Sequence, residues 1–216
     1  MPKQAKLLSK GQIHEFFSIL AANIVPESEL KWGSNLDLVI AVVLSAQCTD
    51  KAVNKATAAL FKKCRTTADY ITLGEENLRE AIRSIGLYKN KAKNIIGLCE
   101  RIQTVFGDVV PDNREDLQSL TGVGRKTANV VLNVAFGQAT MAVDTHIFRV
   151  SNRIGLVHAK NPDQTELKLL KRIPDEFLKD AHHYLILHGR YTCVARTPKC
   201  EICKVAHVCN ALEKQL

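Results

Sequence analysis

Residues 120–127, with the sequence Leu-Thr-Gly-Val-Gly-Arg-Lys-Thr, join two segments in which apolar residues recur at helical spacing. Gly122 and Gly124 permit a tight turn between these segments, because neither carries a side chain that obstructs the backbone. Such a turn points backbone N–H groups outward at the positive end of the second helix, where a phosphate can bind. Taken alone, a glycine turn is more often a plain connection between helices, so its function depends on what accompanies it.

One charged residue of this stretch is a candidate nucleophile. Lys126 lies in the first turn of the helix that the pattern predicts from Arg125 onward. The positive end of the helix dipole and the neighbouring charge of Arg125 both disfavour the protonated amine. Lys126 is therefore placed where a lysine can act as an amine nucleophile.

Most of the remaining chain consists of helical patterns separated by glycine and proline. Almost no stretch shows the sustained period-two alternation of a strand, so the fold class is predicted to be all-α. Residues 38–46 are apolar on almost every side, which indicates a buried central helix. The predicted helices cover residues 38–46, 51–63, 75–85, 89–106, a short segment ending at 120, 125–136, 145–154, 162–172 and 174–188.

The charge balance favours a polyanionic partner. The chain has 216 residues with 30 Lys and Arg against 22 Asp and Glu, a formal net charge of +8 and a pI of about 9.2. The longest apolar run, residues 38–44, is far shorter than the ~20 residues that cross a bilayer. The N-terminus also lacks the apolar segment of a signal peptide. The seven cysteines are therefore expected to be reduced thiols or metal ligands rather than a disulfide framework.

Four of these cysteines crowd into residues 193–209 with the spacing Cys-x6-Cys-x2-Cys-x5-Cys, which indicates a metal site. Zinc and an iron–sulfur cluster both stay open, because zinc sites usually join two close pairs and the spacing differs from the ferredoxin patterns. His207 is a possible rival ligand. The candidate ligands are Cys193, Cys200, Cys203 and Cys209. The cysteines expected to be small core residues are Cys48, Cys64 and Cys99.

Asp144 is the second candidate catalytic residue. It follows the apolar residues 141–143, which would place its carboxylate in partly dry surroundings. There it could have a raised pKa and act as a base, or stay ionised beside a positive centre. The plain alternative is that Asp144 caps the helix that begins at Thr145, since Asp is a favoured N-cap. The two roles are compatible, because a capping carboxylate is held rigidly.

Three motifs together resemble the endonuclease III family, a branch of the helix-hairpin-helix DNA glycosylases. They are residues 120–128, the Val-Asp-Thr-His of 143–146 and the four-cysteine segment, in the family's order and spacing. The resemblance also takes in Ser-Ala-Gln at 45–47 and Ile-Gly-Leu-Tyr at 85–88, so it covers nearly the whole chain. One departure is Thr121, where the family usually has a proline that stiffens the turn.

By position, the resemblance implies that Lys126 is the catalytic lysine and Asp144 the catalytic aspartate. It further implies that the hairpin grips a DNA phosphate, that Gln47 and Leu87 enter the duplex where the damaged nucleotide has left it, and that the four tail cysteines bind a [4Fe–4S] cluster. An exposed loop leucine is the plain alternative for Leu87. The DNA-binding residues expected on this basis are Gln47, Leu87, Gly122, Val123, Gly124, Arg125, Thr127, His146 and Arg190.

The resemblance implies two helical domains with the active site in the cleft between them. A six-helix domain with the hairpin would span residues 28–138, and residues 1–27 with 139–216 would form the iron–sulfur cluster domain. The implied activity is base excision repair. A bifunctional glycosylase would remove oxidised pyrimidines from duplex DNA and cleave the abasic site by β-elimination through a lysine Schiff base.

Two other readings stay open. A monofunctional glycosylase would use the aspartate to activate water and would not need Lys126. A non-catalytic DNA-binding iron–sulfur module would need neither residue for chemistry. In each case the expected partner is double-stranded DNA and not a membrane, and the expected protein is a monomer in the cytoplasm, with the DNA.

Overall fold

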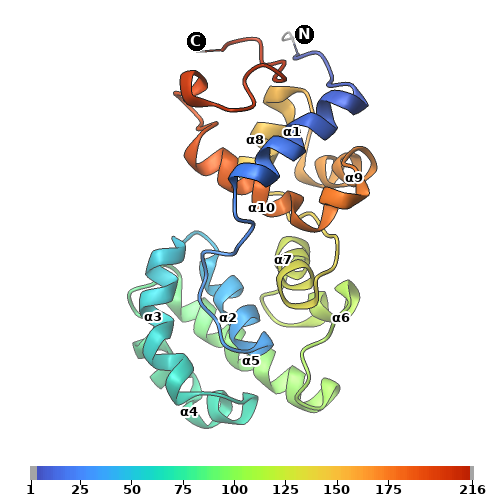
Figure 1. Ribbon diagram of the computed structural model, residues 1–216. Coiled ribbons are helices and arrows are strands. Elements are labelled where there is room, and N and C mark those ends of the chain that lie inside the picture. The colour runs from blue at the N-terminus through green and yellow to red at the C-terminus, as the bar shows by residue number, and fades with distance from the viewer. Residues whose placement is uncertain (1–3, 215–216) are drawn as a thin grey trace. The chain divides into compact units, whose positions relative to one another are not determined.

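The computed structural model describes residues 4–214, and the regular secondary structure in that range is helical (Figure 1). These residues form ten α-helices and one short 3-10 helix, and none of them lies in a strand. The prediction of an all-α fold is confirmed. Within the described part of the chain, no helix is long and apolar enough to cross a membrane.

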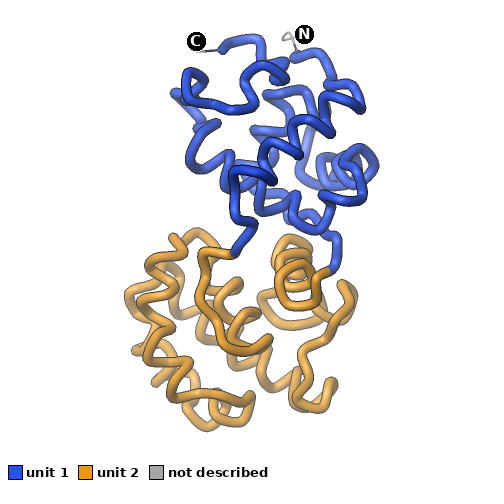
Figure 2. The backbone as a smooth tube through the Cα atoms, in the orientation of Figure 1, with its two compact units in different colours: residues 1–27, 138–216 blue, residues 28–137 orange. Residues whose placement is uncertain are grey.

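The chain divides into two compact units (Figure 2). One unit is residues 28–137, and the other combines residues 1–27 with residues 138–216. The second division point lies one residue before the position expected from the sequence.

Six helices build the unit of residues 28–137. They are α2 (Asn35–Ser45), α3 (Asp50–Lys63), α4 (Thr67–Ala81), α5 (Tyr88–Phe106), α6 (Arg114–Ser119) and α7 (Arg125–Phe136). Side chains cap most of their first turns: Ser34, Thr49 and Asn113 each accept a backbone N–H at the start of α2, α3 and α6. Gly107 and Gly137 end α5 and α7 in the left-handed conformation that glycine adopts without strain. Local sequence thus sets most of the helix boundaries in this unit.

Helix α2 is the centre of this unit. Every residue from Leu36 to Leu44 is buried, and the helix packs against α3, α5 and α7. The predicted buried central helix is confirmed, although it begins at Asn35 and ends at Ser45. Because α2 is buried along its length, packing holds the backbone in place at its C-terminal end, where the next turn begins.

The other unit joins the two ends of the chain. It consists of α1 (Lys10–Asn23), α8 (Thr145–Ile154), α9 (Pro162–Arg172), α10 (Asp175–Tyr191) and η1 (Cys200–Ile202), with α10 packed on both α1 and α8. The Leu8 N–H donates to the carbonyl oxygen of Gly155 at 2.8 Å, and the Asn210 N–H donates to that of Ile154 at 3.2 Å. Segments from both chain ends therefore pair with the end of α8.

Two parts of the helix prediction are wrong. The helix expected over residues 75–85 corresponds to the second segment of α4, which ends earlier than expected, at Ala81. The first segment of α4 begins at Thr67 after a capping box between Thr66 and Asp69 and has no counterpart in the prediction. Gly74 (φ 76°, ψ 161°) is a non-helical residue at the kink between the two segments. Helix α1 has no counterpart among the predicted helices, although a capping box at Ser9 begins it.

Candidate functional site

The glycine stretch forms a tight turn between α6 and α7. The Val123 N–H donates to the carbonyl oxygen of Leu120 at 3.1 Å, and Gly122 has φ 81°. This pattern is that of a type II turn, with Thr121 and Gly122 at its two central positions. A Cβ on Gly122 would lie only 2.9 Å from side-chain atoms of Asn94 on α5, so glycine is required here both by backbone conformation and by space.

Helix α7 begins directly after this turn. Its N-cap is Gly124, and no side chain in the described part of the chain caps it. The first N–H groups of a helix have no partner within the helix, and together with the dipole they can bind an anion. Lys126 is exposed in this first turn, between the half-buried Arg125 and Thr127. The geometry therefore pairs a possible phosphate site with an amine beside it.

Asp144 is the N-cap of α8, as one of its two predicted roles requires. Its Oδ1 accepts the backbone N–H groups of His146 at 2.9 Å and Ile147 at 2.8 Å. Its Oδ2 lies 2.9 Å from Nδ1 of the His146 ring. The Asp144 side chain is only 9% exposed, so the carboxylate is fixed in both position and orientation. Asp144 belongs to the unit of both chain ends, whereas Lys126 belongs to the unit of residues 28–137.

Gln47 and Leu87 share an unusual backbone conformation that the sequence did not reveal. Gln47 has φ 54° and Leu87 has φ 60°, and among the described residues only Asp108 is a third non-glycine residue with positive φ. Both side chains are exposed, that of Leu87 to 58%. L-residues rarely adopt this conformation without compensation from their surroundings, and such positions cluster at functional sites.

Arg190, the remaining predicted DNA contact, lies half-buried in the last turn of α10. Three residues later the chain enters the four-cysteine segment, which belongs to the unit of both chain ends.

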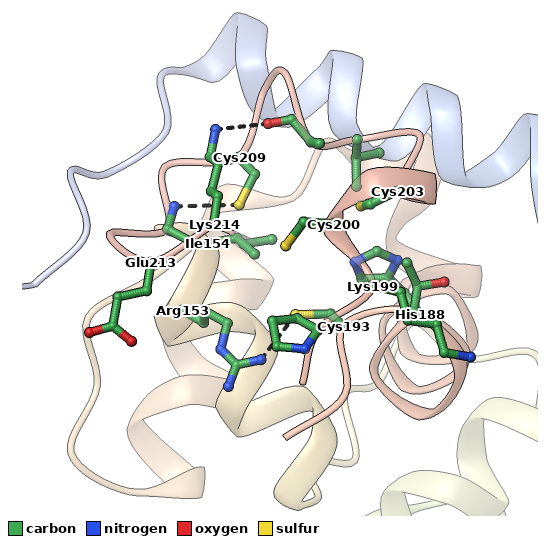
Figure 3. A pocket seen from close by; sticks show the side chains of 15 residues that line it. Arg153, Ile154, His188, Cys193, Lys199, Cys200, Cys203, Cys209, Glu213 and Lys214 are labelled. Carbon is green, nitrogen blue, oxygen red and sulfur yellow. Dashed lines mark hydrogen bonds between the residues drawn. The ribbon is translucent and has the colours of Figure 1, made fainter. Parts of the chain in front are cut away.

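The four tail cysteines line one pocket (Figure 3). Its empty space, including the part open to solvent, is about 420 Å³. Arg153 on α8 holds one side of the segment: its guanidinium donates to the Val194 and Ala195 carbonyls at 2.7 and 2.6 Å and to Cys193 Sγ at 3.5 Å. On another side, the Ala211 N–H donates to Cys209 Sγ at 3.4 Å. Four thiols therefore face a common space within hydrogen-bonded walls.

The donor set of this pocket consists of four cysteine thiols, which is the ligand set of an iron–sulfur cluster. His207 does not line the pocket, and its Nε2 instead lies 3.1 Å from Glu15 Oε1 on α1. The residues present thus fit an iron–sulfur cluster.

The other cysteines lie in the unit of residues 28–137. Cys64 and Cys99 are fully buried in its core, as predicted, while Cys48 is half-buried in the turn after α2. Burial raises the pKa of the Cys99 thiol to about 12 and also raises that of Cys64. Cys64 and Cys99 therefore behave as small apolar residues.

Two family profiles match the chain, and several known proteins are similar to it. A family profile described as "HhH-GPD superfamily base excision DNA repair protein" matches residues 40–175, and the "Iron-sulfur binding domain of endonuclease III" matches residues 193–209. Endonuclease III of Escherichia coli (strain K12) is 53% identical over 189 residues, which cover 88% of this chain and 90% of that protein. Endonuclease III of Haemophilus influenzae is 52% identical over 189 residues, with the same coverage of 88% and 90%.

Solved structures give the same relationship. A trapped endonuclease III–DNA covalent intermediate, the estranged-adenine complex, superposes with a TM-score of 0.88 at 46% identity, over 94% of this chain and 96% of that one. A non-covalent endonuclease III–DNA complex superposes with a TM-score of 0.87 at 45% identity, with coverage of 94% and 96%. Sequence and fold agree over nearly the full length.

Proposed function

Because the chain belongs to the endonuclease III family of helix-hairpin-helix base excision repair proteins, we propose that it is a bifunctional DNA glycosylase and abasic-site lyase acting on oxidised pyrimidines in duplex DNA. The lyase activity is proposed from one observation: Lys126 is exposed in the first turn of α7, directly after the glycine hairpin. The relative in the trapped complex at 46% identity is bound covalently to DNA, and a lysine nucleophile in this chain would form the same kind of bond.

The reaction begins with a base that is taken out of the duplex, since a stacked base is inaccessible. The Lys126 amine attacks the sugar C1′ and forms a C–N bond, while the glycosidic bond breaks and the base departs with its electron pair and a proton. The sugar ring then opens: the C1′–O4′ bond breaks, O4′ takes up a proton, and the lone pair of the lysine nitrogen forms a C1′=N iminium, which makes the C2′ proton acidic. Its loss drives β-elimination, in which the 3′ phosphate leaves with the electron pair of the C3′–O bond. Water then hydrolyses the imine and frees the lysine.

Asp144 would stabilise the cationic sugar or assist the proton transfers. Two backbone N–H groups hold its carboxylate, so the negative charge is oriented before the substrate arrives. His146 binds the other carboxylate oxygen and thereby fixes the plane of the group.

The [4Fe–4S] cluster of this family would be held by Cys193, Cys200, Cys203 and Cys209. When bound, it cross-links four points of a segment that has little regular structure of its own. The glycosylase steps above use none of its chemistry. The loop it orders carries exposed Arg196 and Lys199, which can contact phosphates, while Lys204 donates to Asn23 Oδ1 at 2.7 Å. The protein would act as a monomer in the cytoplasm, where the DNA is.

Product analysis on a duplex with one thymine glycol tests this function. The bifunctional enzyme releases the base and leaves a strand ending in the unsaturated aldehyde of β-elimination. Base release with an intact strand would indicate the water-using glycosylase instead. Binding without base release, by protein that is folded and loaded with its cluster, would indicate the non-catalytic module.

A further inference from the structure

A buried lysine outside the proposed catalytic pair contacts the turn that carries Gln47. Lys91, in the second turn of α5, is 5% exposed. Its ammonium donates to the carbonyl oxygens of Leu44 at 2.9 Å and Ala46 at 2.7 Å. These carbonyls lie at the C-terminal end of α2, where the helix dipole favours a positive charge.

The bond to Ala46 determines the type of this turn. Ala46 has φ −56° and ψ 116°, Gln47 has φ 54°, and the Cys48 N–H donates to the Ser45 carbonyl at 3.0 Å. These angles are those of a type II turn, which differs from the commoner type I by a flip of its central peptide. That peptide is the one whose carbonyl oxygen Lys91 holds. A flip would break the bond, so Lys91 keeps Gln47 in a conformation that otherwise favours glycine.

The same residue also meets Leu87. The backbone N–H of Lys91 donates to the Leu87 carbonyl at 3.0 Å, which is the first hydrogen bond of α5. Leu87 is the N-cap of that helix, and its φ of 60° turns the chain into it. Lys91 is thus bonded to both places: its side chain bonds to the turn that carries Gln47, and its backbone bonds to Leu87.

We propose that Lys91 is a positioning residue, which holds the Gln47 turn in register with Leu87 so that both side chains are presented together to the opened duplex. This inference rests on the proposed function, because it assigns the two exposed side chains to DNA. Lys91 itself is buried and touches neither the substrate nor the reacting atoms.

The test compares two single-turnover rates in Lys91→Met, which keeps the apolar stem and removes the three donors. One rate is base release from a duplex with one thymine glycol, and the other is β-elimination at a preformed abasic site in the same duplex. Base release is expected to slow about tenfold or more, because a stacked base must be displaced, whereas elimination should change less than about threefold. Lys93→Met, at an exposed position on the same helix, is the control and should change neither rate.

A second comparison separates positioning from general destabilisation. Gln47→Ala should show the same split between the two rates, and Lys91→Met combined with Gln47→Ala should be no slower than Gln47→Ala alone. If Lys91→Met does not fold, as judged by melting and by cluster absorbance, Lys91→Gln is measured in its place.

Equal losses in both rates, additive losses in the double variant, or unchanged base release in Lys91→Met would overturn the assignment. Failure of the proposed function would appear differently, as wild-type protein that neither releases the base nor cleaves the abasic site.

Discussion

His146 contacts Asp144 through both its backbone and its ring: the backbone N–H donates to Oδ1 at 2.9 Å, and ring Nδ1 lies 2.9 Å from Oδ2. Asp144 is therefore at once a helix cap and a nearly buried carboxylate held in one orientation. Substitution can separate these two roles, because asparagine caps helices as well as aspartate does but carries no charge.

Asp144→Asn is expected to leave stability nearly unchanged and to slow base release by about 10²–10⁴-fold, since the charge or proton acceptor is lost. Asp144→Ala should lose the cap as well and cost about 0.5–2 kcal/mol of stability. Thermal unfolding and single-turnover base release measure the two effects separately. Full activity in Asp144→Asn would leave the cap as the only role of this residue.

The turn at residues 120–123 predicts a stabilising substitution. Thr121 occupies the second position of a type II turn, which favours proline, and the preceding Leu120 is extended (φ −74°, ψ 139°), as a residue before proline must be. Thr121→Pro should therefore raise the free energy of unfolding by about 0.4–1 kcal/mol by restricting the unfolded chain. Denaturant unfolding measures this. A loss of stability would mean that the Thr121 side chain, which packs against Gly97, contributes more than the turn gains.

Gly155 predicts a strongly destabilising substitution where the chain ends meet. It has φ 87°, and a Cβ there would overlap the carbonyl oxygen of Lys6. Gly155→Ala should displace the N-terminal segment from α8 and cost several kcal/mol, about the range of the largest single-residue effects. Gly11→Ala, in open space within α1, is the control and should be neutral or stabilising by up to ~1 kcal/mol. Similar melting temperatures for wild type and Gly155→Ala would contradict the observed packing.

Cysteine reactivity should follow burial. With the cluster in place, an alkylating reagent at pH 8 should modify the half-buried Cys48 and spare Cys99, whose pKa burial raises to about 12. Mass spectrometry of peptides from native and unfolded protein identifies the modified sites. Rapid modification of Cys99 in the native protein would show that the core opens readily.

Folded Cys99 retains its proton, whereas the unfolded thiol ionises near pH ~8.5. The contribution of Cys99 to the free energy of unfolding should therefore fall progressively as the pH rises from ~8.5 toward 12.

Much of the fold could be predicted from the sequence, because its signals are local. Glycine stops, capping side chains and apolar periodicity mark most helices, including the hairpin and the buried α2. The prediction omits the first segment of α4, since only its capping box at Thr66 and Asp69 marks it, and the non-helical Gly74 separates it from the segment that follows.

The site was predictable to a lesser degree. The hairpin, the cap at Asp144 and the cysteine segment have local signatures. The left-handed conformations of Gln47 and Leu87 do not, because neither residue is a glycine. The bond that holds Gln47 comes from Lys91, more than forty residues away in the chain, and only tertiary structure brings these residues together.

The central claim is that Lys126 forms a Schiff base with DNA, and borohydride trapping tests it most directly. Wild-type protein, Lys126→Ala and the exposed-lysine control Lys62→Ala would each be incubated with a duplex containing one abasic site and then reduced. A covalent protein–DNA adduct is expected from wild type and Lys62→Ala and not from Lys126→Ala. An adduct of undiminished yield from folded, cluster-loaded Lys126→Ala, or none from wild type, would contradict the claim.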